Sequence, residues 1–154
     1  MFKTIVWATD GSKLADGALD LVRELARQDG SKVVAVHAIE LLNSRFGAPP
    51  ASEGESEEKI ERQVEALRND GFDATLEVRS GSQDVATLIA GAAEDVGADL
   101  IVVATHGAGG LTAALMGSVA RALCHSAHRP LLVVPPPGVA TRPSASVSNS
   151  AHTG

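Results

Sequence analysis

Short apolar runs alternate along the chain with longer segments in which apolar side chains recur every three or four positions. The short runs predict buried β-strands, and the periodic segments predict amphipathic helices. We expect strands at 4–8, 32–38, 74–78, 100–104 and 131–135, and helices at 14–29, 56–69, 84–96 and 118–127.

Several boundaries between these elements carry signals of their own. Ser12 is an N-cap residue for the first helix, and Gly30 favours its end. Either Ser82 or Asp84 is expected to cap the third helix. Residues 43–55 are rich in Pro, Gly and Ser, which predicts a loop before the second helix.

Strands that alternate with helices indicate an α/β fold, in which an open parallel sheet carries helices on both faces. Near-continuous apolar strands fit this class, because such strands are buried on both sides. The segment 74–78 alternates instead and is expected nearer the sheet edge. A length of 154 residues suits one domain, predicted at 1–135, and the Pro/Ser-rich segment 136–154 is expected to be a disordered tail.

Composition excludes several partners. The formal net charge is −6 and aromatic residues make up 3%, so neither nucleic acid nor an anionic membrane is an expected partner. Cys124 is the single cysteine, which fits a reducing compartment. The apolar run before Asp10 is too short for a signal peptide or a membrane span, so we expect a cytoplasmic protein.

A glycine-rich loop follows the fourth predicted strand and leads into the fourth helix. Gly107, Gly109, Gly110 and Gly117 lie in it, followed by Ser118. Such a loop can cradle phosphate, because glycine lets the backbone approach and N–H groups at the helix start point at the anion. The alternative is a tight connection that needs glycine only for its turns. Ser118 has two compatible candidate roles, donating its hydroxyl to phosphate and capping the helix.

Other polar residues are candidate ligands. Asp10, at the end of the first strand, suits ribose or a Mg²⁺ ion that bridges phosphates, or else a side chain that stabilises a turn. His106 is interpreted as a loop residue that faces ligand or solvent. Cys124, His125 and His128 share one helix end, where packing and capping are favoured over metal binding.

Three motifs in order resemble the universal stress proteins of the nucleotide-binding type. That family carries Gly, two residues, Gly, nine residues, Gly and then Ser or Thr; here Ala104 takes the first place and Gly107, Gly117 and Ser118 the others. The run 4–8 with its Asp-Gly-Ser turn resembles the family's first strand and turn, and 33–38 its second strand, with the resemblance covering residues 2–135.

The resemblance implies a flavodoxin-like sheet, similar to the adenine nucleotide alpha hydrolases, with strand order 3-2-1-4-5. In that order ligands bind at the carboxyl ends of strands 1 and 4. The expected ligand is ATP or a related adenine nucleotide with Mg²⁺, the metal held through Asp10 and the phosphates. The implied site residues are Ala8, Thr9, Asp10, Ala38, Ala104, His106, Gly107, Gly110, Gly117, Ser118, Val119 and Ala120.

The chain has no Gly-Lys-Ser or Gly-Lys-Thr motif to neutralise a triphosphate during transfer. This omission favours a regulatory, stress-response switch with little turnover. The alternatives are a nucleotide-free dimeric interaction module of the same family, and a slow ATPase or cyclic-AMP binder. A homodimer is expected through the last strand, because an exposed apolar edge such as 131–134 tends to pair.

Ala104 departs from the family pattern. If the backbone there needs a positive φ, the Cβ costs about 1–2 kcal/mol. If glycine serves only to let the ligand approach, alanine is tolerated with weaker binding.

Overall fold

The computed structural model describes residues 1–41, 51–105 and 116–136. These residues form a five-stranded parallel sheet with the order β3-β2-β1-β4-β5, which confirms the predicted fold and strand order. The elements are β1 (Thr4–Ala8), α1 (Lys13–Asp29), β2 (Lys32–Glu40), α2 (Ala51–Asn69), β3 (Ala74–Gly81), α3 (Val85–Asp95), β4 (Leu100–Ala104), α4 (Ser118–Ser126) and β5 (Leu131–Val134).

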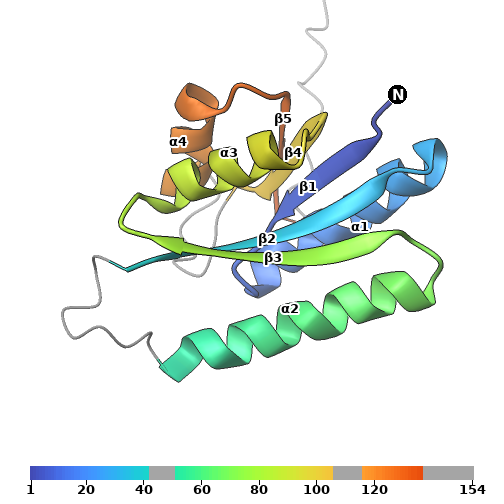
Figure 1. The fold of residues 1–154 in the computed structure, drawn as a ribbon, viewed down its shortest axis with the longest axis horizontal. Helices are drawn as coiled ribbons and strands as arrows, with labels where there is room; N and C mark the ends of the chain where they lie inside the picture. Colours follow the sequence, from blue (N-terminus) through green and yellow to red (C-terminus); the bar gives the residue numbers. More distant parts are fainter. Residues whose placement is uncertain (42–50, 106–115, 137–154) are drawn as a thin grey trace, which may run out of the picture.

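The helices form a layer on each face of the sheet (Figure 1). The chain moves from β1 outward to β3 with α1 and α2 on one face, then returns to β4 and β5 with α3 and α4 on the other. Each face buries its own apolar cluster. Trp7, Val22 and Ile60 belong to the cluster under α1 and α2, whereas Val36 and Leu123 belong to the cluster under α3 and α4.

Strand burial follows position in the sheet. Every residue of β4 is buried, as are four of the five residues of β1, because both strands have neighbours on either side and helices above and below. All four residues of β5 are only half-buried, since β5 lies at an edge of the described sheet. The predicted edge position of β3 is also confirmed.

Two expected boundaries differ from the structure. The predicted loop 43–55 is wrong at its end, because α2 already begins at Ala51. Acidic side chains stabilise a helix N-terminus, and Glu53 lies in the first turn of α2 despite Gly54 beside it. In addition, β2 and β3 run further than their apolar patterns suggest, because their parallel pairing continues to Glu40 and Gly81.

The predicted caps of α1 and α3 form. The Ser12 hydroxyl accepts a hydrogen bond from the Ala15 N–H at 3.3 Å, and Gly30 ends α1 with φ of 65°. Asp84, rather than Ser82, caps α3 and accepts from the Thr87 N–H at 2.7 Å. Hydrogen bonds from the Thr87 side chain and main chain lower the pKa of the Asp84 carboxyl.

No helix among the described residues is long and apolar enough to cross a membrane. The expected tail, 136–154, lies outside the described residues apart from Pro136.

Candidate functional site

The central strands β1 and β4 lie side by side, but the chain leaves them toward opposite faces of the sheet. Trp7 is paired with Val102, and continuing that register places Thr9 beside Ala104. In open α/β sheets, ligands bind at the carboxyl ends of the strands where the strand order reverses. The strand order therefore brings the expected residues at the ends of β1 and β4 to one edge.

A hydrogen-bonded turn follows β1. The buried Thr9 donates its N–H to the Val36 carbonyl at 3.0 Å, and its hydroxyl oxygen accepts from the Gly11 N–H at 3.1 Å. The Asp10 Oδ1 atom accepts from the Ser12 N–H at 2.9 Å, so the turn interpretation of Asp10 is confirmed. Asp10 is exposed at the sheet edge.

Helix α2 packs directly onto this turn. Gly11 has φ of +77°, and a Cβ there would lie 3.2 Å from the Ser56 backbone. Lys59 donates to the Gly11 carbonyl at 2.7 Å and pairs with Asp16 at 2.8 Å. Sequence reasoning missed Lys59 and Asp16, because nothing local marks two residues 43 positions apart as partners.

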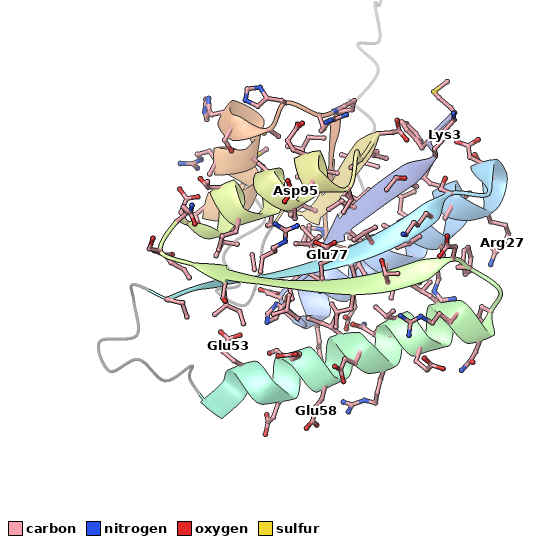
Figure 2. The ribbon with its side chains drawn as sticks, viewed as in Figure 1. Lys3, Arg27, Glu53, Glu58, Glu77 and Asp95 are labelled. Atoms are coloured by element: carbon pink, nitrogen blue, oxygen red, sulfur yellow. The ribbon has the colours of Figure 1, made fainter. Side chains whose placement is uncertain are left out.

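A buried histidine connects β2 to the same turn. The residue His37 is buried, and its Nδ1 atom lies 3.1 Å from the Thr9 carbonyl oxygen. Its Nε2 atom lies 3.1 Å from Glu53, which projects from the beginning of α2 (Figure 2). The sequence places His37 in the second strand, but only the fold reveals Glu53 as its partner.

Ala104 fits the fold without strain. It ends β4 opposite Val134, and no non-glycine residue among those described has a positive φ. Its methyl group belongs to the apolar cluster under α1 and α2, together with Trp7. The first of the two explanations, a backbone that requires glycine, is therefore wrong for this chain.

The N-terminus of α4 completes the edge. Gly117 is its N-cap residue, with φ of −60° and no side-chain capping bond, and its N–H donates to the Thr105 carbonyl. Ser118 is the first helical residue and is exposed, so the prediction that it caps the helix is wrong. The expected site residues His106, Gly107 and Gly110, with the neighbouring Gly109, lie outside the described residues.

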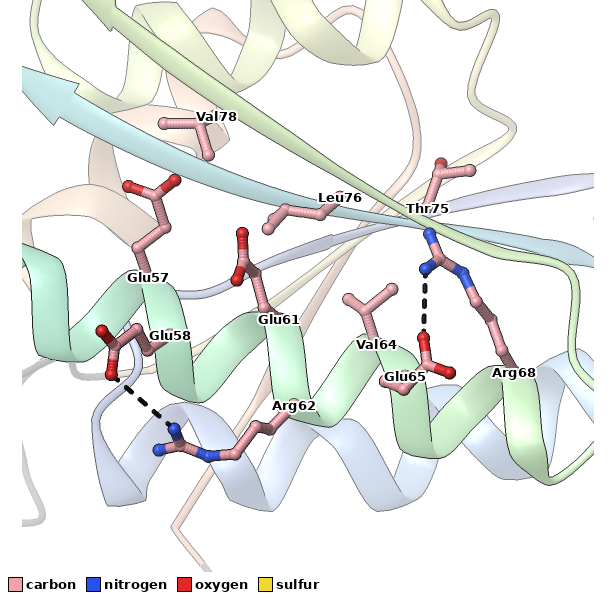
Figure 3. A pocket seen from close by; sticks show the side chains of 10 residues that line it. All are labelled: Glu57, Glu58, Glu61, Arg62, Val64, Glu65, Arg68, Thr75, Leu76 and Val78. Atoms are coloured by element: carbon pink, nitrogen blue, oxygen red, sulfur yellow. Dashed lines mark hydrogen bonds and ion pairs between the residues drawn. The ribbon is translucent and has the colours of Figure 1, made fainter.

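A groove of about 800 Å³ lies elsewhere, between α2 and β3 (Figure 3). Four glutamates line it but only two arginines, and both arginines already pair with glutamates: Arg62 with Glu58 and Arg68 with Glu65. Glu57 and Glu61 extend from α2 toward β3 (Figure 3). An excess of negative charge repels phosphate, so this groove is a poor site for a nucleotide.

Within the described residues, no group of three or more His, Cys, Asp or Glu side chains is placed to hold a metal ion. Cys124 is free and exposed, and His125 and His128 are exposed near the end of α4. Any metal at the strand-end edge would need oxygen atoms from a ligand as well as from Asp10.

The order of the sheet and the turns at its carboxyl edge define a doubly wound α/β protein. The sequence profile described as the Universal stress protein family matches residues 1–135. A universal stress protein of Thermus aquaticus is 32% identical over 139 residues, spanning 87% of this chain and 99% of the relative. The chain belongs to the universal stress protein family.

Solved structures share this fold. The hypothetical protein MJ0577 superposes with a TM-score of 0.76 and 28% identity, covering 88% of this chain and 96% of that protein. A universal stress protein from Archaeoglobus fulgidus in complex with dAMP has a TM-score of 0.68 and 23% identity, with coverage of 87% and 98%. A universal stress protein in complex with cAMP has a TM-score of 0.66 and 22% identity, and the match covers 86% of this chain and 97% of that chain.

Proposed function

We propose that this protein binds ATP or a related adenine nucleotide at the carboxyl edge of β1, β2 and β4, as a regulatory switch with little turnover. The observation that carries the proposal is the N-terminus of α4. Its N-cap residue makes no side-chain capping bond, and its first turn holds no acidic residue. Helix N–H groups in that state attract an anion, and the helix dipole adds to the attraction.

The other described helices with an assigned N-cap are capped by their own side chains. Ser12 caps α1 and Asp84 caps α3, so their first turns are already satisfied. Because α4 alone of these three lacks such a cap, we assign the phosphates to the N–H groups of Ser118, Val119 and Ala120. Neighbouring structures in complex with dAMP and with cAMP support an adenine nucleotide of some kind.

The adenine and the metal are assigned to the β1 and β2 side of the edge. The main chain of Ala8, Thr9 and Ala38 would flank the base, while Asp10 would hold Mg²⁺ through the phosphates. Asp10 fits this role because its carboxylate is exposed and oriented by the Ser12 N–H at 2.9 Å. Bound Mg²⁺ would neutralise phosphate charge. The protein residues would bind the nucleotide and the metal and orient them.

Thermal unfolding tests the proposal directly. At about 100 times its Kd, a ligand stabilises the folded state by about 2.7 kcal/mol, which is a Tm increase of roughly 5–11 °C here. We expect this increase with Mg-ATP, ADP, AMP or cyclic AMP, and a smaller one with Mg-GTP. No increase with any adenine nucleotide would favour the alternative, a dimeric interaction module.

We also propose that the protein is a cytoplasmic homodimer paired through β5. The four half-buried apolar residues of β5 lie at an edge that no other described strand covers. Antiparallel pairing with a second copy would bury that edge. The free Cys124 is consistent with a reducing compartment.

A further inference from the structure

The main chain of β2 continues beyond the end of β1. Ala8 is paired with Val36, whereas β2 runs on to Glu40 beside β3. Alternate residues of a strand in a parallel sheet direct their main-chain groups to opposite neighbours. The Val33 N–H donates to Asp73 on the β3 side, while Val36 accepts from Thr9 on the β1 side. Ala38 therefore faces the β1 side, like Val36.

The parallel ladder would continue with a bond from the Ala38 N–H to the Thr9 carbonyl, because Thr9 already donates to Val36 at 3.0 Å. That bond is absent among the described residues. The Thr9 carbonyl instead lies 3.1 Å from His37 Nδ1. A carbonyl can only accept, so Nδ1 carries the hydrogen. The His37 imidazole thus replaces one main-chain hydrogen bond of the β1–β2 ladder.

We propose that His37 is a positioning residue that keeps the Ala38 main chain open for the ligand. It satisfies the Thr9 carbonyl in place of the Ala38 N–H, and the Gly11 N–H that would meet the Ala38 carbonyl donates to the Thr9 hydroxyl instead. The Ala38 N–H and carbonyl therefore have no main-chain partner on the β1 side among the described residues. This donor and acceptor, side by side on one extended residue, match the acceptor N1 and the donor amino group of adenine. The inference rests on the proposed function, because it assigns a role to His37 at the same site.

The second ring nitrogen explains why the imidazole stays in place. Nε2 lies 3.1 Å from Glu53, and the His37 side chain is 4% exposed against 27% for Glu53. The ring is therefore held between two oxygen atoms, one from β1 and one from α2. Through this contact, the start of α2 supports the arrangement of Thr9 and Ala38.

Amide hydrogen exchange in the full-length, nucleotide-free protein tests the proposal. In the wild type, the Ala38 amide should exchange about tenfold or more faster than the Thr9 amide, because it lacks a hydrogen bond. In His37→Leu the Thr9 carbonyl is released, the ladder extends, and the Ala38 amide becomes about tenfold or more protected. His37→Asn places an N–H donor near the Nδ1 position and should keep wild-type exchange.

Nucleotide affinity should change across the same variants in parallel with the exchange of the Ala38 amide. We expect Mg-ATP to bind His37→Leu about tenfold or more weakly and His37→Asn nearly normally, with His125→Leu as a control for loss of an exposed histidine. A protected Ala38 amide in the wild type, or unchanged exchange in folded His37→Leu, would overturn the inference. If the wild type binds no nucleotide, the proposed function fails, but the exchange result still decides the role of His37. If His37→Leu does not fold, exchange of the Ala38 amide in the wild type and in His37→Asn decides the role of His37.

Discussion

At the scale of single residues, glycine and alanine have different reasons for their places at the strand-end edge. Gly11 has a positive φ and also meets α2, so both conformation and packing require it. Gly117 has φ of −60° and ψ of 159°, which any residue adopts. Its lack of a side chain therefore suits the close approach of a ligand rather than a turn.

Gly117→Val should fold and lose nucleotide binding. Valine tolerates the extended backbone at this position, but its branched side chain would occupy the space before the first N–H groups of α4. We expect the affinity for Mg-ATP to fall by about tenfold or more in calorimetry. Gly91→Ala, an exposed glycine of α3 with open space around it, is the control. Normal binding by a folded Gly117→Val would remove the phosphate assignment.

Ala104→Gly should lower stability and leave affinity unchanged, because the methyl group lies in the core cluster rather than against the ligand. The second explanation of Ala104, weaker binding, would instead predict tighter binding by this variant. The methyl group packs into the cluster under α1 and α2, so its removal costs about 0.5–1 kcal/mol in unfolding free energy. Ala35→Gly, in the same cluster but paired with Trp7 within the sheet, should lose a similar amount. If Ala104→Gly binds Mg-ATP more tightly and Ala35→Gly does not, the methyl group obstructs the ligand.

At the scale of elements, the strands and three of the helices could be predicted from local patterns. The strand bounds of β1 and β4 were predicted correctly, because uninterrupted apolar runs bounded by polar residues leave little ambiguity. The start of α2 was not predicted correctly, because the Pro, Ser and Gly residues near Ala51 indicate a loop. The apolar pattern of 56–69 also predicts Ala66 on the buried face of α2, but Ala66 is exposed, since the helix turns its Ile60, Val64 and Leu67 positions to the sheet.

The carboxylate of Asp99 holds the beginning of β1. Its Oδ2 atom accepts from the Lys3 and Thr4 N–H groups at 2.8 and 2.9 Å. These main-chain bonds, that from Thr4 first, lower the pKa of Asp99 in the folded state. A lowered folded-state pKa stabilises the protein above the unfolded pKa, and that stabilisation is lost as pH falls through the folded value.

Asp99→Ala should therefore destabilise the protein at neutral pH, with the difference from wild type narrowing below about pH 4. Urea unfolding at a series of pH values measures this difference. Asp20→Ala, an exposed carboxylate of α1 with no hydrogen bond or ion pair to the described residues, is the control. A difference that is constant from neutral to acid pH would show that the Asp99 charge is irrelevant.

At the scale of the whole molecule, the fold was predictable but the connections around the site were not. The order of elements and their motifs led to the correct sheet. The contacts of Lys59 with Gly11, and of Glu53 with His37, join residues far apart in sequence. No local pattern marks such pairs, because they form only when α2 packs against the turn after β1.

A homodimer through β5 can be tested by blocking that edge. Pro130 and Val134 accept bonds from the β4 side, so the N–H of Val133 faces outward. Val133→Pro removes this donor without breaking the β4 ladder and should give a monomer in light scattering. Ser80→Pro makes the same change at the outward side of β3 and should remain a dimer. A monomeric wild type would contradict the proposed dimer.

The central claim is that adenine nucleotide binds at the carboxyl edge of β1, β2 and β4. Titration of the isotopically labelled protein with Mg-ATP, followed by amide chemical shifts, tests it most directly. We predict saturable shifts centred on Ala38 and on residues 117–120, with Asp10 and Gly11 affected between them. Saturable shifts centred instead on the acidic groove between α2 and β3, or no saturable shift at all, would contradict the account.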